Sequence, residues 1–129
     1  MLRESELNAA FSDTKLQEFH TNEIALIKDI HTRAKSNTKE QNLLLIKSLI
    51  TLISERFAYE EQSMQASADA AFGVHKFEHD KELLDIKSMM EFYDMTGDAN
   101  SLISYLEDAL VPWIIEHTDT MDGGATDGY

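Results

Sequence analysis

Apolar residues recur every three or four positions in four separate stretches of this 129-residue chain. Such spacing places them on one face of an α-helix. We therefore expect helices over about 14–35, 39–66, 74–95 and 99–121, and no stretch carries the strict alternation of a strand. Four long amphipathic helices with short connections favour an all-α, up-down-up-down antiparallel four-helix bundle.

Local signals mark the ends of these helices. Thr38 and Gln41 have the spacing of a capping box, which predicts the start of the second helix. Gly97 and Asp98 provide a glycine stop and an N-cap between the third and fourth helices. Pro112 lies inside the fourth helix, where it removes a backbone hydrogen bond and should cause a kink.

The length fits one domain with one core, so we treat 1–129 as a single domain with an N-terminal arm (1–13) and a frayed tail (123–129). A net charge of −13 disfavours binding to nucleic acid or to anionic lipid. The chain has no cysteine, so any metal must be held by nitrogen and oxygen. Because we find neither a signal-peptide pattern nor a membrane-spanning apolar run, we expect a cytoplasmic protein.

Two histidines interrupt the apolar face of the third helix. His75 and His79 are four residues apart, so their imidazoles lie one above the other on that face. A single inward histidine is more often satisfied by a nearby carboxylate, but a pair at this spacing can bind one metal ion. The pair therefore favours a metal site.

The inward faces of the other three helices carry polar residues as well. These are His20 on the first helix, Arg56 and Glu60 on the second, and His117 followed by Asp122 on the fourth. Di-metal sites in four-helix bundles are built from such inward side chains on facing helices. The set predicts a metal centre in the bundle core.

The pattern resembles the hemerythrin family of non-haem di-iron, oxygen-binding proteins. The motifs that carry the resemblance are His75-x-x-x-His79-Asp80, Trp113-Ile-Ile-Glu-His117-x-x-x-x-Asp122, and Arg56-Phe57-Ala-Tyr-Glu60-Glu61-x-x-Met64, where the family has His-Phe-x-x-Glu-Glu-x-x-Met. His20 precedes an aliphatic run, as the first ligand of the family does. The resemblance spans His20 to Asp122.

The resemblance implies a di-iron centre bridged by an oxo or hydroxo group. One iron would be held by His75, His79 and His117, and the second by His20 and the residue at position 56, with Glu60 and Asp122 as bridging carboxylates. The open coordination position would bind dioxygen or a small anion. We expect no enzyme, because no nucleophile–base pair and no glycine-rich phosphate loop is present.

Position 56 departs from the family because arginine is not a metal ligand. Three outcomes are open. Glu23 or Glu61 could replace the lost ligand, the second iron could bind with an extra water, or the Arg56 cation could replace that iron and pair with carboxylates.

Two hypotheses follow. The first is a di-iron, hemerythrin-like protein that binds or senses dioxygen. The alternative is a degenerate hemerythrin fold, mononuclear or metal-free, used for metal binding, signalling or protein interaction. A homo-oligomer and a signalling partner are compatible with both.

Overall fold

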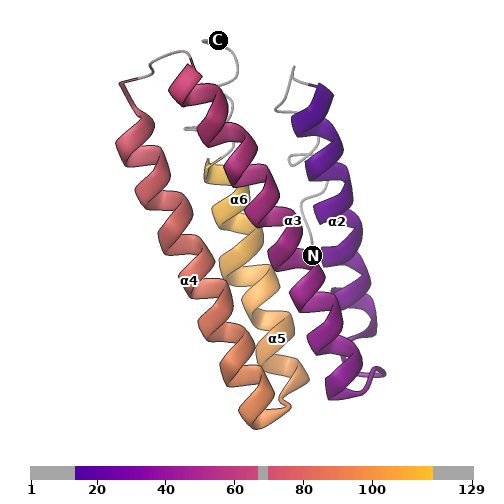
Figure 1. Ribbon diagram of the computed structural model, residues 1–129. Helices are drawn as coiled ribbons and strands as arrows, with labels where there is room; N and C mark the ends of the chain where they lie inside the picture. The colour runs from indigo at the N-terminus through magenta and orange to yellow at the C-terminus, as the bar shows by residue number, and fades with distance from the viewer. Residues whose placement is uncertain (1–13, 67–69, 118–129) are drawn as a thin grey trace.

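The computed structural model describes residues 14–66 and 70–117, and within these ranges the regular structure is entirely helical. The elements are α2 (Thr14–Arg33), α3 (Lys39–Ala66), α4 (Phe72–Thr96), and a continuous last segment made of α5 (Ala99–Tyr105), a π-helix η1 (Leu106–Leu110) and α6 (Val111–His117) (Figure 1). All four predicted helices are confirmed over the described residues. The predicted arm (1–13) and tail (123–129) lie outside them.

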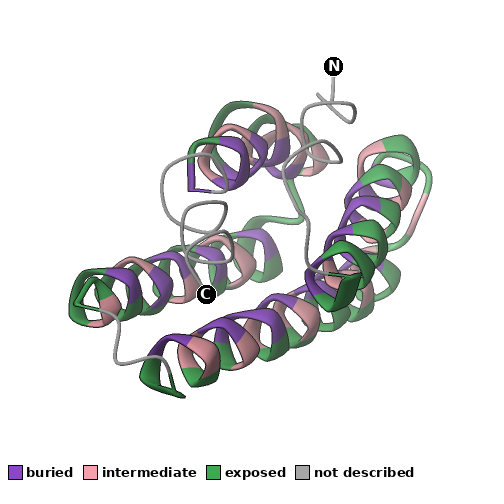
Figure 2. Ribbon diagram, turned by 90° about the horizontal axis from the view of Figure 1, so that it is seen from above, coloured by how far each residue is buried: buried purple, intermediate pink, exposed green. Residues whose placement is uncertain are grey.

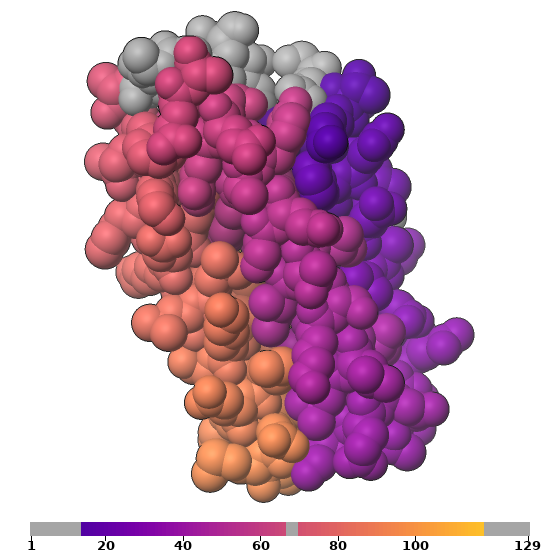
Figure 3. Space-filling model, in the orientation of Figure 1, coloured from indigo at the N-terminus to yellow at the C-terminus, as the bar shows by residue number. Residues whose placement is uncertain are grey.

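The helices lie side by side, and α3 packs against both α2 and α4 (Figure 1). Side chains of α3 and α4 meet on the face shown in Figure 3. Seen from above, the buried side of each helix turns toward the other helices (Figure 2). This arrangement is consistent with an up-down bundle. In the described part of the chain, no helix is both long enough and apolar enough to cross a membrane.

The predicted apolar faces form most of the core. Buried residues that follow the predicted helical spacing are Leu16, Ile24, Ile27, Ile46, Leu49, Ile53, Ile86, Leu106, Leu110 and Ile114. Phe72, Leu83 and Met90 share the helical spacing of His75 and His79 on α4, and they are only partly buried. Helical spacing therefore predicts which face of each helix points inward, but it does not predict how deeply each residue on that face is buried.

The predicted helix ends are present. The Thr38 backbone N–H donates to Gln41 Oε1 (2.9 Å), and the Gln41 N–H donates to Thr38 Oγ1 (3.1 Å), which completes the capping box. Gly97 ends α4 with φ at 64°, a left-handed conformation that glycine adopts without steric cost. The Asp98 side chain accepts a hydrogen bond from the Asn100 N–H and caps α5.

A π-helical segment lies directly before Pro112. The Val111 N–H donates to the Leu106 carbonyl, five residues back, instead of four. In a regular α-helix each residue is rotated by about 100° from the one before, so a residue four positions on points about 40° away from the first. A π-helical turn contains more residues, so the rotation per residue is smaller and residues four apart point in more similar directions. Leu106, Leu110 and Ile114 are all buried. Pro112 was predicted to kink this helix, and the structure has a π-helical segment directly before it.

Candidate metal centre

Four buried side chains from three helical segments meet in the core. Glu60 lies near the end of α3, His75 and His79 lie in the first turns of α4, and His117 is the last residue of α6. Each is at most 4% exposed. Each offers one nitrogen or oxygen donor, and these four atoms lie within 4.8 Å of one another. Three imidazoles and one carboxylate form a donor set that suits iron, zinc or copper.

The separations between the donors are close to those that one ion requires. His79 Nε2 lies 3.1 Å from His117 Nε2 and 3.1 Å from Glu60 Oε1. His75 Nε2 lies 3.5 Å from the same Glu60 oxygen. An ion about 2.1 Å from each donor places neighbouring donors about 3.0 Å apart in octahedral geometry and about 3.4 Å apart in tetrahedral geometry. The residues therefore fit a single metal ion.

Glu61 sets the orientation of His79. The carboxylate oxygen Oε2 of Glu61 lies 2.9 Å from His79 Nδ1, so Nδ1–H donates to it. In the neutral ring, Nε2 then carries a lone pair, which faces the lone pairs of Glu60 Oε1. A cation among the donors turns this repulsion into attraction. A carboxylate behind a histidine that faces other donors is the arrangement that fixes the tautomer of metal-ligating histidines.

Aromatic rings hold two of the three imidazoles in place. Phe57 stacks on His79 with 3.7 Å between ring centroids and 2° between the planes. Trp113 stacks on His117 at 4.4 Å and 11°. Because both rings are packed flat against an aromatic neighbour, their nitrogens keep one direction, and the surrounding apolar surface limits access of water.

Arg56 lies on α3, four residues before Glu60, and contacts one member of this group. Its Nε donates to Glu23 Oε2 at 2.8 Å, and its Nη1 donates to Glu60 Oε2 at 3.4 Å. The guanidinium has no lone pair for a metal, and its positive charge would repel one. Glu60 thus faces the histidines with one oxygen and Arg56 with the other. Among the described residues, the surroundings of Arg56 do not fit a second metal ion.

The structure places the remaining predicted site residues as follows. His20 is buried on α2 but is not a member of the four-residue group. Glu23 and Glu61, the predicted substitute ligands, contact Arg56 and His79 respectively. Asp122 lies outside the described residues. A metal-ligand role for these four residues stays a prediction.

Glu82 is a buried carboxyl group that the sequence reasoning missed. It lies one turn after His79 on α4 and is 4% exposed. Burial, followed by the nearby charge of Asp85, raises its pKa to about 8. Its spacing from His79 and Ile86 is helical and could have identified it, but glutamate is so seldom buried that the pattern alone predicts exposure.

Comparisons of the chain with protein-family models, with curated proteins and with solved structures found no match.

Proposed function

We propose that this protein is a hemerythrin-like metal-binding protein, an up-down-up-down four-helix bundle that holds one ion through Glu60, His75, His79 and His117. The observation that carries the proposal is the convergence of these four buried donors within 4.8 Å. The Glu61–His79 contact supports it, because it directs the lone pair of one imidazole toward the other donors. Iron is the metal that the resemblance to hemerythrin favours.

The contacts of Arg56 favour one ion over two. In the resemblance, position 56 supplies a histidine to the second iron, whereas here a cation at this position pairs with Glu23 and Glu60. A guanidinium replaces the positive charge of that iron and satisfies the carboxylates without metal. Arg56 therefore takes the electrostatic role of the second metal.

A single iron with four protein ligands has room for a further small ligand. Iron bound by imidazoles and a carboxylate supplies affinity for dioxygen and small anions such as azide. The residues of this chain would position the ion, exclude bulk water through Phe57 and Trp113, and hold Glu60 in place through Arg56. We therefore place the function in binding or sensing of such a small ligand.

The di-iron centre is the second candidate. His20 is buried on α2, three residues before Glu23, which itself contacts Arg56. A second ion held by His20 would require the Arg56 guanidinium to leave Glu23 and Glu60.

Metal analysis distinguishes the two candidates. Protein produced in iron-supplemented medium should contain about one metal ion per chain, and His75→Ala and His117→Ala should lose it. His31→Ala is the matched control, since His31 contacts Glu107 and does not belong to the group, and its metal content should equal that of the wild type. Two tightly bound irons per chain would support the di-iron centre, and a metal-free protein after reconstitution would contradict both candidates.

A further inference from the structure

The outward side of α4 carries most of the exposed large apolar side chains in the part of the chain that the structure describes. These side chains are Leu44 on α3 and, on α4, Val74, Phe77, Leu84, Phe92 and Met95. At about 100° per residue, the five on α4 fall within an arc of about 80°. His75, His79 and Ile86 are buried on the other side of the same helix. We call the five-residue surface the outer apolar face.

The outer apolar face lies at the edge of the bundle. α4 packs against α3 and α5, and its outward side points away from both (Figure 1). A helix with apolar side chains on two opposite sides is typical of a helix that is covered on both sides. A continuous exposed apolar surface of this kind indicates an interaction with another protein.

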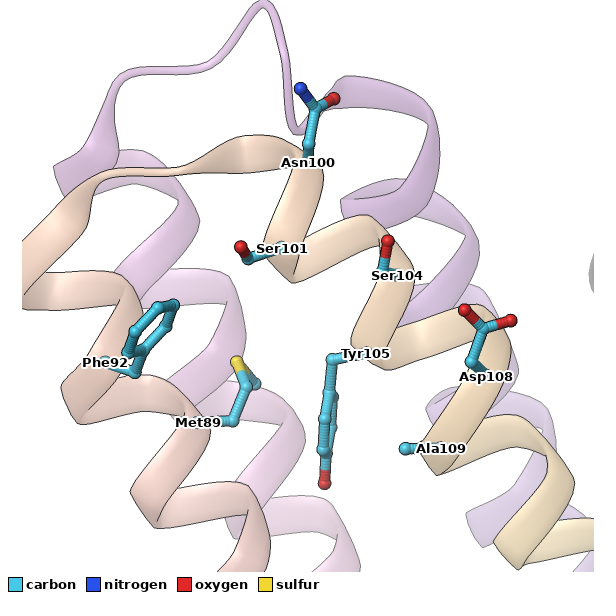
Figure 4. A pocket seen from close by; sticks show the side chains of 8 residues that line it. All are labelled: Met89, Phe92, Asn100, Ser101, Ser104, Tyr105, Asp108 and Ala109. Carbon is cyan, nitrogen blue, oxygen red and sulfur yellow. The ribbon is translucent and has the colours of Figure 1, made fainter.

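The apolar surface continues from Phe92 onto the last segment. A shallow, open hollow lies between α4 and the α5–η1 segment, and Met89, Tyr105 and Ala109 are among the residues that line it beside Phe92. Figure 4 shows Phe92 and Met89 on one side of the hollow and Tyr105 on the other. Small-molecule sites are concave and enclose most of their ligand, so an open hollow suits the flatter surface of a protein partner better.

The outer apolar face is nearly symmetric about Leu84. Phe77 lies seven residues before Leu84 and Phe92 eight residues after it, while Val74 lies ten residues before and Met95 eleven after. A helix whose two halves repeat in reverse order is complementary to itself when two copies lie antiparallel about a twofold axis. Leu84 then meets Leu84 of the second copy, and Phe77 lies against Phe92 of the second copy. This symmetry favours a second copy of the chain as the partner.

The charges beside Leu84 favour the same antiparallel arrangement. Lys81 and Asp85 are both exposed on this side of α4. In the antiparallel pair, Lys81 of each copy comes within about one helical turn of Asp85 of the other, so two attractive contacts form. In a parallel pair, Lys81 would face Lys81 of the second copy, and like charges in contact are unfavourable.

The area is sufficient for a reversible dimer. Each of the five side chains exposes on the order of 100 Å², so two copies would bury on the order of 1,000 Å², which is near the lower limit for specific interfaces.

We propose that two copies of this protein associate through the outer apolar face, with their α4 helices antiparallel and Leu84 at the twofold axis. The metal donors His75 and His79 are on the opposite side of α4, so the dimer does not depend on the metal centre.

Sedimentation velocity of the full-length protein tests this association, with EDTA and without it. Physiological ionic strength screens the net charge of −13 on each chain. Between micromolar and millimolar protein we expect the sedimenting species to change from one chain to two chains and to stop there. A single-chain species at every concentration would overturn the proposal, as would growth beyond two chains.

Leu84→Glu should raise the dissociation constant of the dimer at least about 100-fold, because it places two carboxylates together at the twofold axis. Leu44→Glu is the matched control. Leu44 on α3 is 66% exposed and Leu84 is 65% exposed, but Leu44 lies outside the outer apolar face. Its substitution should change the dissociation constant by no more than about twofold, and both variants should keep the circular dichroism spectrum of the wild type. Equal effects of the two substitutions would overturn the proposal.

A charge exchange tests the orientation of the two copies. Lys81→Glu should weaken the dimer about tenfold, because a carboxylate then faces Asp85 of the second copy. The combined Lys81→Glu, Asp85→Lys variant should recover most of the lost affinity, since each pair is reversed but remains opposite in charge. A combined variant no tighter than Lys81→Glu alone would rule out the antiparallel arrangement.

Discussion

Nε of Arg56 donates a hydrogen bond to Oε2 of Glu23 over 2.8 Å, and neither side chain is more than 1% exposed. This pair connects α3 to α2 inside the core, and the same guanidinium also reaches Glu60 on α3. Removing two charges from water costs more than their attraction returns in many proteins, but removing one partner leaves the other charged and buried. The pair therefore constrains which substitutions the core tolerates.

Arg56→Met should destabilise the metal-free protein by about 3–5 kcal/mol, because Glu23 and Glu60 lose their cation. Glu23→Gln should destabilise the protein by a similar amount, because Arg56 then loses the carboxylate of Glu23. The combined Arg56→Met, Glu23→Gln variant should lose less than the sum of the two single losses. Urea unfolding in the presence of EDTA measures all three.

The surface pair of Arg33 and Asp29 is the control for this series. Its nitrogen–oxygen distance is 3.0 Å, close to that of the buried pair, but Arg33 is 64% exposed. Arg33→Met should change stability by no more than about 0.5 kcal/mol. If Arg56→Met had an equally small effect, the buried pair would not contribute to the stability of the protein, and Arg56 would not hold Glu60 in place.

Glu61→Gln should weaken metal binding about 10- to 100-fold, because the amide no longer holds Nδ1–H of His79 with a full charge. A competition titration with a chelator, using Zn²⁺ or Co²⁺ as a probe, measures this. Asp80→Asn is the matched control: Asp80 shares the Lys76 partner of Glu61 but is exposed, and its loss should leave the affinity within about twofold. An unchanged affinity in Glu61→Gln would remove Glu61 from the site.

The sequence predicted the four helices because each depends on information within one segment. The Thr38–Gln41 capping box and the Gly97 stop are local, and the spacing of His75 and His79 fixes their common face whatever surrounds them. The burial of residues in the last segment was harder to predict. Val111 and Ile115 are buried, although regular helical spacing from Leu106 and Leu110 does not place them on the inward face. The π-helical segment before Pro112 changes the rotation of the helix, and hydrophobic periodicity does not reveal it.

The sequence indicated which residues belong to the candidate site better than which contacts they make. The sequence named Glu60, His75, His79 and His117 as metal ligands together with His20 and Asp122, and the structure brings the first four together. Which carboxylate Arg56 contacts across the core depends on how α2 and α3 pack against each other, and in the structure it is Glu23. A helical pattern does not contain the relative rotation of two helices, so three outcomes for Arg56 stayed open at that level.

Asn42→Ala should destabilise the protein by about 1–3 kcal/mol. Asn42 is fully buried, and its amide donates to the Ala34 carbonyl and to the Tyr93 hydroxyl, each at 2.9 Å. Removal of the amide leaves both acceptors buried without this donor. Tyr93→Phe removes a single hydroxyl from the same contact and should cost about 1 kcal/mol. Equal stability of Asn42→Ala and the wild type in urea unfolding would contradict the contact.

Glu82 should make the stability of the protein fall as the pH rises. Burial and Asp85 raise the pKa of its carboxyl group from 4.5 to about 8, so the folded state binds a proton that the unfolded state has released. Below pH 4.5 both states are protonated and the carboxyl group has no net effect on folding. Between pH 4.5 and about 8 the unfolded state gains from ionisation, and stability falls until the folded state ionises as well.

Glu82→Gln removes this titration and should therefore stabilise the protein at high pH. At pH 9 we expect a gain of about 2 kcal/mol over the wild type, and almost none at pH 4.5, in urea unfolding with EDTA. Glu55→Gln, at an exposed position of α3, should show the same small difference from the wild type at both pH values. A Glu82→Gln gain that is independent of pH would show that the carboxyl group is ionised in the folded protein throughout, and the raised pKa would be wrong.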